Sequence, residues 1–212
     1  MAENTQKLRI IPLGGVDEFG KNITVVEYGD DMLVVDCGSI FPKEDMLGVD
    51  LVIPDVTYLI KNRERIRGML LTHGHEDHIG AIPYLLRNFN LPIYATKLTI
   101  GLIEGKLKEH KLLSSANLNV VKAGDTVKLG KLSVEFIHVK HSIPDAVGFA
   151  IKCAGGTVVH TGDFKIDTTP IDDKVIDIAR FAELGKEGVL ALLADSTNVE
   201  RTGYTASERI VG

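Results

Sequence analysis

The sequence predicts an α/β protein in which two β-sheets pack face to face with helices on their outer faces. Short β-rich runs alternate with segments of helical periodicity, and mixed strand-rich stretches occur twice, each followed by a helix. A dense cluster of metal-ligand side chains at 72–78 comes directly after an apolar run, where a strand is expected to end. These observations give the fold class and place a candidate site at strand ends.

Length and composition describe an ordinary globular protein. The chain has 212 residues, of which 44% are hydrophobic and 25% charged, enough for one sizeable core. Its net charge of −5 gives no support to broad electrostatic binding of nucleic acid. No apolar run approaches the roughly 20 residues of a membrane span, and the N-terminus is too polar for a signal peptide. With only two cysteines, we expect a cytoplasmic protein with no membrane partner.

The first half of the chain is expected to form mostly strands. Apolar, β-rich runs lie at 7–12, 23–28, 32–35, 68–71 and 91–95. The glycine-containing stretch 13–20 lacks the G-x-x-x-x-G-K-[ST] pattern of a phosphate-binding loop, so a hairpin-like connection is the better interpretation. The stretch 41–54 is expected to be a loop. Helices are expected at 56–62, 79–86 and 98–110, the last with apolar residues at the helical period.

The second half repeats this alternation. Strands are expected at 118–121, 126–129, 132–139, 147–153, 157–160 and 189–194, and a helix at 175–184. Thr205-Ala206-Ser207-Glu208 has the form of a capping box, which predicts the beginning of a helix. Because the sequence stops soon afterwards, we expect residues 1–212 to be part of a longer polypeptide.

The stretch 72–78 reads T-H-G-H-E-D-H and predicts a metal site. Imidazole and carboxylate ligands suit zinc, which makes little geometric demand of its own. Gly74 allows a tight turn, so that His73 and His75 can converge on one ion. Asp77 and His78 precede the predicted helix at 79–86 and would face a second ion. A polar loop with coincidental histidines is the alternative, which so dense a cluster disfavours.

Two further candidates follow predicted strands downstream. His141 comes directly after the strand at 132–139, and Asp163 comes after the strand at 157–160. Taken singly, each is an ordinary strand-end or turn residue. Taken with the cluster, they complete two ligand sets: His73, His75 and His141 for one ion, Asp77 and His78 for the other, and Asp163 bridging both.

Other polar residues have competing interpretations. Asp36 ends the strand at 32–35 and is either a turn former or a carboxylate that orients a metal-bound histidine. Cys37 is expected to be a small buried thiol rather than a ligand. His110, His138 and His160 have no comparable setting and are not expected to bind metal.

These motifs resemble the metallo-β-lactamase superfamily and, within it, the ribonuclease J family. The histidine cluster, with Asp36 upstream and His141 and Asp163 downstream, carries the broader resemblance. The narrower one rests on L-G-G at 13–15 with G-K-N at 20–22, L-G-V-D at 47–50 with I-P-D at 53–55, the stretch 80–87, H-S-I-P-D at 141–145, H-T-G-D-F-K at 160–165 and A-D-S-T-N at 194–198.

The resemblance implies an αββα sandwich and a two-zinc phosphodiesterase with 5′→3′ exonuclease and endonuclease activity. The expected partners are 5′-monophosphorylated single-stranded RNA and further copies of the full-length protein. Residues 1–212 would form an incomplete metallo-β-lactamase domain, followed by an inserted β-CASP domain, a last zinc-ligating histidine and a C-terminal domain. Asp77, beside His78, is the candidate for orienting the attacking water and accepting its proton. Asp36 and Asp195 would support the site from behind.

Two other functions stay open at this point. A different hydrolase on the same scaffold, such as a thioesterase or lactonase, would use the same ligands, because fold alone does not fix function. The chain could instead be an inactive fragment that binds partners.

Overall fold

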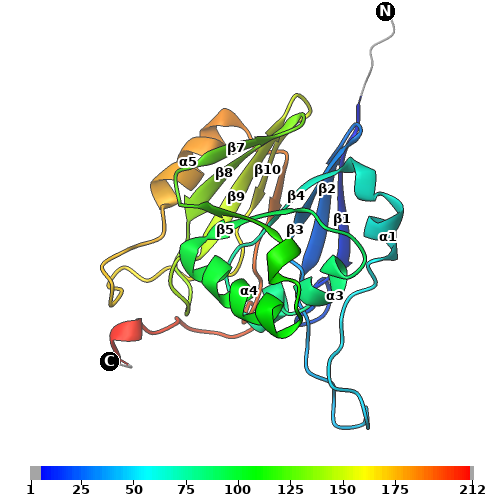
Figure 1. Ribbon diagram of the computed structural model, residues 1–212. Coiled ribbons are helices and arrows are strands. Elements are labelled where there is room, and N and C mark those ends of the chain that lie inside the picture. The colour runs from blue at the N-terminus through cyan, green and yellow to red at the C-terminus, as the bar shows by residue number, and fades with distance from the viewer. Residues whose placement is uncertain (1–5, 211–212) are drawn as a thin grey trace, which may run out of the picture.

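The computed structural model describes residues 6–210, which form two β-sheets in face-to-face layers (Figure 1). The first sheet has six strands in the order β1-β2-β3-β4-β5-β6. Strands β1 to β3 are antiparallel, and β3 to β6 run parallel to one another. Their bounds are Leu8–Gly14, Ile23–Tyr28, Asp31–Val35, Ile66–Leu70, Pro92–Thr96 and Asn117–Val121.

The second sheet has five strands in the order β11-β10-β9-β8-β7. Only the pair β10 and β11 is parallel. Because β9 is antiparallel to both of its neighbours, β8 and β10 point the same way and end at the same edge. The bounds of β7 to β11 are Thr126–Leu129, Leu132–His138, Val147–Cys153, Gly156–His160 and Ala191–Leu193.

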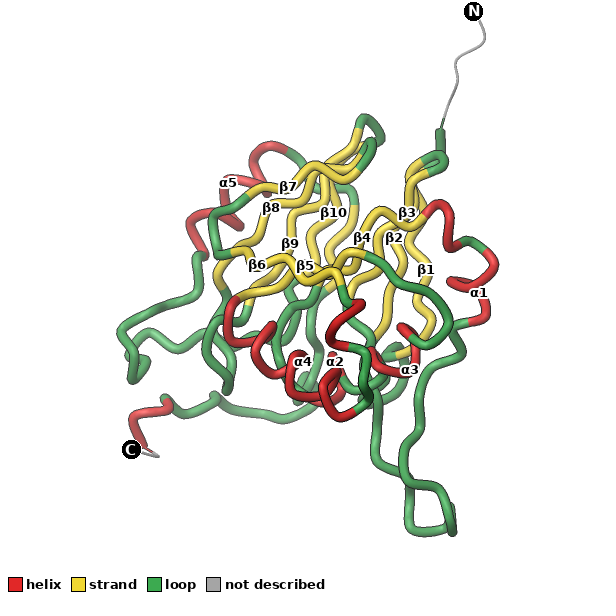
Figure 2. The backbone as a smooth tube through the Cα atoms, in the orientation of Figure 1, coloured by secondary structure: helices red, strands yellow, loops and turns green. Residues whose placement is uncertain are grey.

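Helices cover the outer faces of both sheets, as Figure 2 shows. The first sheet carries α1, α2, α3 and α4, and the second carries α5. The α-helices span Thr57–Lys61, Glu76–Ile79, Ile82–Leu86, Lys97–Glu109 and Ile178–Glu187, with 3-10 turns at Arg63–Arg65, Leu113–Ser115 and Glu208–Ile210. This is the αββα arrangement, so the predicted fold class is confirmed.

Strands β2 and β3 are apolar on both faces because each face meets a different layer. Val25 and Val34 pack against the helices, whereas Val26, Leu33 and Val35 pack between the sheets. Alternation of side chains along a strand supplies both cores from one short segment. This explains why hydrophobic residues stand next to one another in both strands, at 25–26 in β2 and at 32–35 in β3.

The hairpin-like connection predicted at 13–20 is confirmed, since it joins the antiparallel strands β1 and β2. Cys37 is a buried free thiol, as predicted, and Cys153 is also free. Among the described residues, we find no helix with the length and hydrophobicity needed to cross a bilayer.

Two helix predictions need correction. The single helix expected at 79–86 is wrong: α2 and α3 are separate, because Pro83 has no N–H to continue the ladder and the Ala81 N–H donates to the Cys37 carbonyl at 2.9 Å. The helix expected from residue 175 begins at Ile178. Asp177 caps it by accepting a bond from the Arg180 N–H at 3.0 Å.

The capping box at 205–208 predicts the beginning of a helix, and within the described residues a 3-10 turn begins there at Glu208–Ile210. The Ser207 hydroxyl donates to the Asp167 carboxylate at 3.0 Å, and the Glu208 side chain pairs with lysines from other loops. The Glu208 N–H, whose hydrogen bond the Thr205 side chain would accept in a capping box, donates instead to Oδ2 of Asp167 at 3.0 Å.

We expect Phe136→Ala to lower the free energy of unfolding by about 3–5 kcal/mol. Phe136 is fully buried between the sheets and meets Phe149 edge to face with ring centroids 5.3 Å apart, so truncation leaves a cavity. The matched control is Phe41→Ala, at a ring that is 74% exposed, with an expected change within about 0.5 kcal/mol. Urea unfolding measures both, and equal losses would contradict this account of the core.

Candidate metal centre

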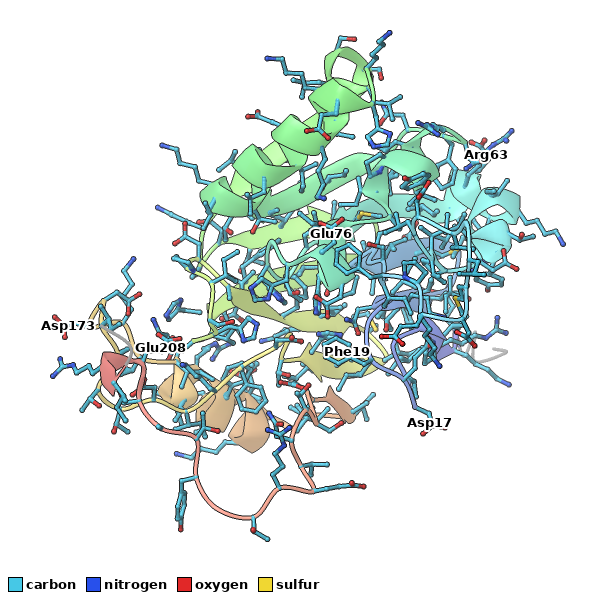
Figure 3. The ribbon with its side chains drawn as sticks, turned by 90° about the horizontal axis from the view of Figure 1, so that it is seen from below. Asp17, Phe19, Arg63, Glu76, Asp173 and Glu208 are labelled. Atoms are coloured by element: carbon cyan, nitrogen blue, oxygen red, sulfur yellow. The ribbon has the colours of Figure 1, made fainter. Side chains whose placement is uncertain are left out.

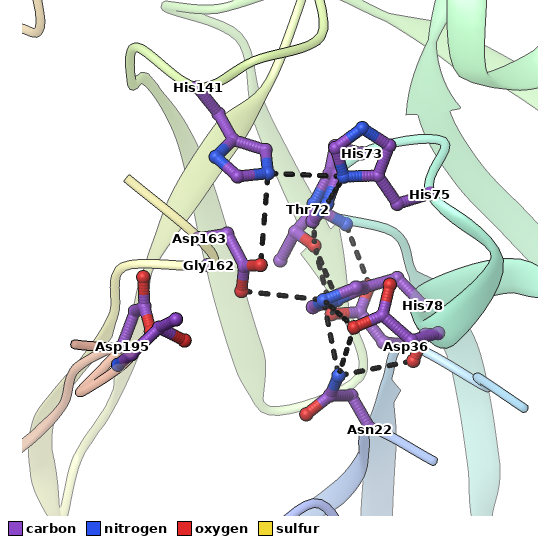
Figure 4. Close-up of polar contacts among 12 residues, drawn as sticks. Asn22, Asp36, Thr72, His73, His75, His78, His141, Gly162, Asp163 and Asp195 are labelled. Atoms are coloured by element: carbon purple, nitrogen blue, oxygen red, sulfur yellow. Dashed lines mark hydrogen bonds and ion pairs between the residues drawn. The ribbon is translucent and has the colours of Figure 1, made fainter. Parts of the chain in front are cut away.

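Six of the predicted site residues converge at one edge of the sandwich, just after the ends of three strands. Figure 4 shows five of them: His73, His75, His78, His141 and Asp163. His73, His75, Asp77 and His78 follow β4, His141 follows β8 and Asp163 follows β10. The site therefore takes side chains from both sheets. An edge where the carboxyl ends of parallel strands meet is the usual place for a site in open α/β sheets.

The first group of candidate ligands consists of three histidines. The Nδ1 atom of His75 lies 3.1 Å from Nε2 of His73 and 3.1 Å from Nε2 of His141. Their ligand atoms all lie within 4.8 Å of one another. Three imidazole nitrogens that face one another leave lone pairs in mutual repulsion unless a cation or proton lies among them. This arrangement fits a metal ion that takes nitrogen ligands.

The second group consists of His73, His78 and Asp163. Nε2 of His78 lies 3.3 Å from Oδ1 of Asp163, whose Oδ2 lies 3.7 Å from Nε2 of His141. Asp163 thus reaches both groups, as a bridging carboxylate would. Asp77 lies beside this group, with its Oδ2 3.5 Å from Nε2 of His78.

Asp36 orients the histidines from behind. Its Oδ2 lies 2.8 Å from Nδ1 of His78 and accepts a bond from the Thr72 hydroxyl at 2.9 Å, and that hydroxyl lies 3.0 Å from Nδ1 of His73. With Nδ1 of both rings engaged, Nε2 of each ring is left for the site. Asp36 therefore contacts His78 directly and His73 through Thr72, the position in which a carboxylate would orient a ligating histidine.

The titration of these groups follows from their burial and their charges. Burial lowers the pKa of His73 to about 2 and also lowers the pKa of His141. Burial opposes ionisation of Asp163, but His78 and the other histidines bring its pKa down to about 2. Burial also acts to lower the pKa of His78, yet Asp36 and Asp163 raise it well above its ordinary value. Neutral His73 and His141 therefore lie beside the ionised Asp163 carboxylate, which also favours the proton on His78 that a metal ion at Nε2 would displace.

Asn22 and Thr72 are site residues that sequence reasoning did not identify. The Asn22 side-chain amide donates to the Asp77 carbonyl at 3.1 Å and to Oδ2 of Asp77 at 3.3 Å, and it lies 3.1 Å from Nε2 of His78. The Asn22 backbone N–H also donates to the Asp77 carbonyl at 3.1 Å. Only the folded pairing of 20–22 with 76–78 shows this role, because the two segments are far apart in sequence.

The remaining candidates lie at the margin. The Asp195 N–H donates to the Thr161 hydroxyl at 3.2 Å, and its carboxylate accepts from the Thr197 N–H at 2.7 Å. Nδ1 of His160 accepts from the Gly162 N–H at 3.0 Å and so shapes the loop before Asp163. His110 lies elsewhere, 2.9 Å from the Arg87 guanidinium.

A cavity of about 490 Å³ opens beside the candidate ligands. Asp36, Asp77, His78 and Asp163 line it at the metal side. The connection between β1 and β2 and the stretch 192–197 form the other walls. The loop predicted to be a simple hairpin connection therefore also borders the site.

The sequence model of the metallo-beta-lactamase superfamily matches residues 16–201. With the αββα sandwich and the convergent histidines and aspartates, this match identifies the chain as a member of the metallo-β-lactamase superfamily. Solved structures agree on the fold. A protein of unknown function from Enterococcus faecalis has a TM-score of 0.66 at 18% identity, covering 94% of this chain and 52% of its own. Zinc-bound PqqB from Methylobacterium extorquens has a TM-score of 0.57 at 18% identity, covering 87% and 65%.

Within the superfamily, the chain is similar to ribonuclease J proteins over almost its whole length. It is 52% identical to ribonuclease J of Synechocystis over 100% of this chain and 34% of the relative. It is 50% identical to ribonuclease J of Thermus thermophilus, over 95% of this chain and 36% of that relative. It is 46% identical to ribonuclease J2 of Bacillus subtilis, over 99% of this chain and 38% of that relative. The chain thus spans about a third of the length of these relatives.

We expect Gly38→Ala to destabilise the chain and disturb the site. A Cβ atom at residue 38 would lie 1.5 Å from the Asp77 carbonyl oxygen, so the backbone that carries Asp77 and His78 must move. Overpacking of this kind costs typically ~1–3 kcal/mol. The matched control is Gly101→Ala in α4, where nothing lies within 4 Å and stability should rise by up to about 1 kcal/mol. Urea unfolding measures both, and a neutral Gly38→Ala would contradict the close approach.

Proposed function

We propose that this chain forms the metal-binding catalytic part of a zinc-dependent RNA phosphodiesterase with 5′→3′ exonuclease and endonuclease activity. The observation that carries the proposal is the convergence of His73, His75 and His141 beside His78 and Asp163, in a chain about half identical to ribonuclease J proteins. Residues 1–212 would be part of a metallo-β-lactamase domain within a longer protein.

The donor set fits two zinc ions. His73, His75 and His141 would hold one. His78 and Asp163, with Asp77 beside them and His73 within reach, would hold the other, and Asp163 reaches both. When bound, zinc supplies Lewis-acid chemistry: it polarises phosphoryl oxygens and makes water nucleophilic near neutral pH.

The chain's own residues provide orientation and proton transfer. Burial opposes ionisation of Asp77, but His78 holds the pKa of Asp77 below its ordinary value, so this carboxylate is charged at neutral pH. Asp77 borders the cavity and can orient a water there and accept its proton. Asn22 fixes the Asp77 carboxylate, and Asp36 fixes His78 and, through Thr72, His73. Asp195 shapes the opposite wall through its bond to Thr197.

We expect the purified chain to retain zinc through its first ligand group after dialysis, with closer to one ion than two per chain. The first group offers three converging imidazole nitrogens within this chain, so we expect it to be the tighter one. A His73→Ala, His75→Ala double variant should lose most of the zinc, whereas His110→Ala should retain it. Metal analysis by mass spectrometry provides the measurement. Unchanged zinc in the double variant would refute the ligand assignment.

The reaction is tested with 5′-monophosphorylated single-stranded RNA beside a thioester of similar size. Two proteins are compared: this chain, and a chimera in which it replaces the matching segment of the Thermus ribonuclease J. The net charge of −5 offers little attraction for phosphates, which dominate nucleic-acid affinity. We therefore expect slow cleavage of RNA by the chain alone and faster cleavage by the chimera. Preference for the thioester would point to another hydrolase on the same scaffold.

Within the chimera, we expect Asp77→Asn to reduce RNA turnover by about 10²–10⁴-fold, the usual contribution of a general base. The amide keeps the shape but loses the charge and the proton-accepting oxygen. Zinc at the three histidines should remain. Asp17→Asn, at another aspartate that lines the cavity, is the matched control and should stay within about twofold of the parent. Activity of Asp77→Asn within tenfold of the parent would argue against the role.

A further inference from the structure

Lys140 is a buried cation directly before the candidate ligand His141. It is 7% exposed, and its Nζ lies 2.8 Å from Oδ1 of Asp172 and 3.3 Å from Oε2 of Glu208. A buried ammonium is costly unless it is paired and hydrogen-bonded. The two carboxylates therefore fix the position of this side chain.

The other oxygen of Glu208 reaches the loop that carries Asp163. Its Oε1 lies 2.5 Å from Nζ of Lys165, which comes shortly after Asp163. The Lys165 N–H also donates to the Lys140 carbonyl at 2.7 Å. One carboxylate thus holds the loop after β8 and the loop after β10 together, and a backbone bond joins the same two loops.

Glu208 is itself held in place by its own backbone. Its N–H donates to Oδ2 of Asp167 at 3.0 Å, and the Ser207 hydroxyl donates to the same oxygen at 3.0 Å. Asp167 is 6% exposed. In Figure 3, Glu208 lies on the inner side of the C-terminal 3-10 turn, whereas Asp173 lies at the periphery of the molecule.

The strands that lead into these two loops are not neighbours in the sheet. Strand β9 lies between β8 and β10, so the two strand ends are separated by two strand spacings, about 10 Å. Yet Nε2 of His141 and Oδ2 of Asp163 lie 3.7 Å apart. Sheet hydrogen bonds alone do not set this convergence.

We propose that Glu208 is a positioning residue for the metal centre, which it shapes by holding Lys140 and Lys165 and so setting the separation of His141 and Asp163. This rests on the proposed function, because it assumes that both residues bind metal. Glu208 acts through the two lysines and their loops.

The test is Glu208→Gln in the full chain, titrated with Co²⁺ as a spectroscopic substitute for zinc. We expect the dissociation constant to rise about tenfold, within the range for groups that support metal ligands, and the visible absorption bands of the bound ion to change. The matched control is Arg209→Gln on the same turn. It removes an exposed pair, Arg209 with Asp173 at 3.3 Å, and should leave affinity and spectrum unchanged.

Lys165→Met completes a double-variant cycle. If Glu208 acts partly through Lys165, adding Glu208→Gln to Lys165→Met should weaken Co²⁺ binding less than it does in the parent. Full additivity would overturn the proposal. The proposal would also be overturned if the parent binds Co²⁺ normally and Glu208→Gln shows the same affinity and spectrum. This holds even if the variant unfolds at a lower urea concentration, because a role in stability alone is not the role proposed. Failure of the parent itself to bind Co²⁺ would instead refute the metal centre.

Discussion

The arrangement of the candidate ligands depends on the hydrogen bonds of one buried carboxylate, that of Asp36, with Thr72 and His78. Asp36 is 1% exposed, and leaving such a charge unpaired would cost several kcal/mol. Its Oδ1 accepts from the Thr72 N–H at 2.8 Å, and its Oδ2 meets the Thr72 hydroxyl and Nδ1 of His78. Asp36 has φ +60°, a conformation that is costly for a residue with a Cβ. Its N–H donates to Leu70 on β4 at 2.9 Å, so the end of β3 is fixed to the strand that leads into the histidine cluster.

This anchoring holds together imidazole nitrogens that repel one another, beside carboxylates that His78 attracts. The rings of His73, His75 and His141 have centroids 4.7–4.8 Å apart in every pair, and Asp77 and Asp163 are both held ionised close to them. Folding therefore concentrates lone pairs and negative charge at one point of the edge. A cation that binds only the folded chain relieves this repulsion and stabilises the fold in proportion to its affinity. When no cation is bound, hydrophobic burial in the core between the sheets must offset this repulsion for the chain to stay folded.

Much of this arrangement is readable from the sequence, and the unpredicted parts have physical reasons. The two-layer fold can be predicted because the hydrophobic residues of β2 and β3 and the turns between strands directly reflect which positions are buried. The cluster after β4 gives the candidate ligands because their spacing is local. Asn22 is not readable in this way, since its contact with Asp77 depends on how the β1–β2 connection lies across another loop. The contact of the Ser207 hydroxyl with Asp167 is hidden for the same reason, since only the folded chain brings these two residues near each other.

The two sheets meet at the site through backbone as well as side chains, and this sets how accurately the ligands can be placed. The Val147 N–H of the second sheet donates to the Thr72 carbonyl at 2.9 Å, directly before His73. Gly162, at φ +59°, comes so close that a Cβ there would lie 2.9 Å from Cβ of Thr72. A side chain at residue 162 would separate the loops that carry Asp163 and His73. Glycine is thus needed where β10 ends, because only bare backbone lets ligands from two sheets approach one centre. The contacts of Thr72 with Val147 and Gly162 therefore fix both how the two sheets pack and where the candidate ligands lie.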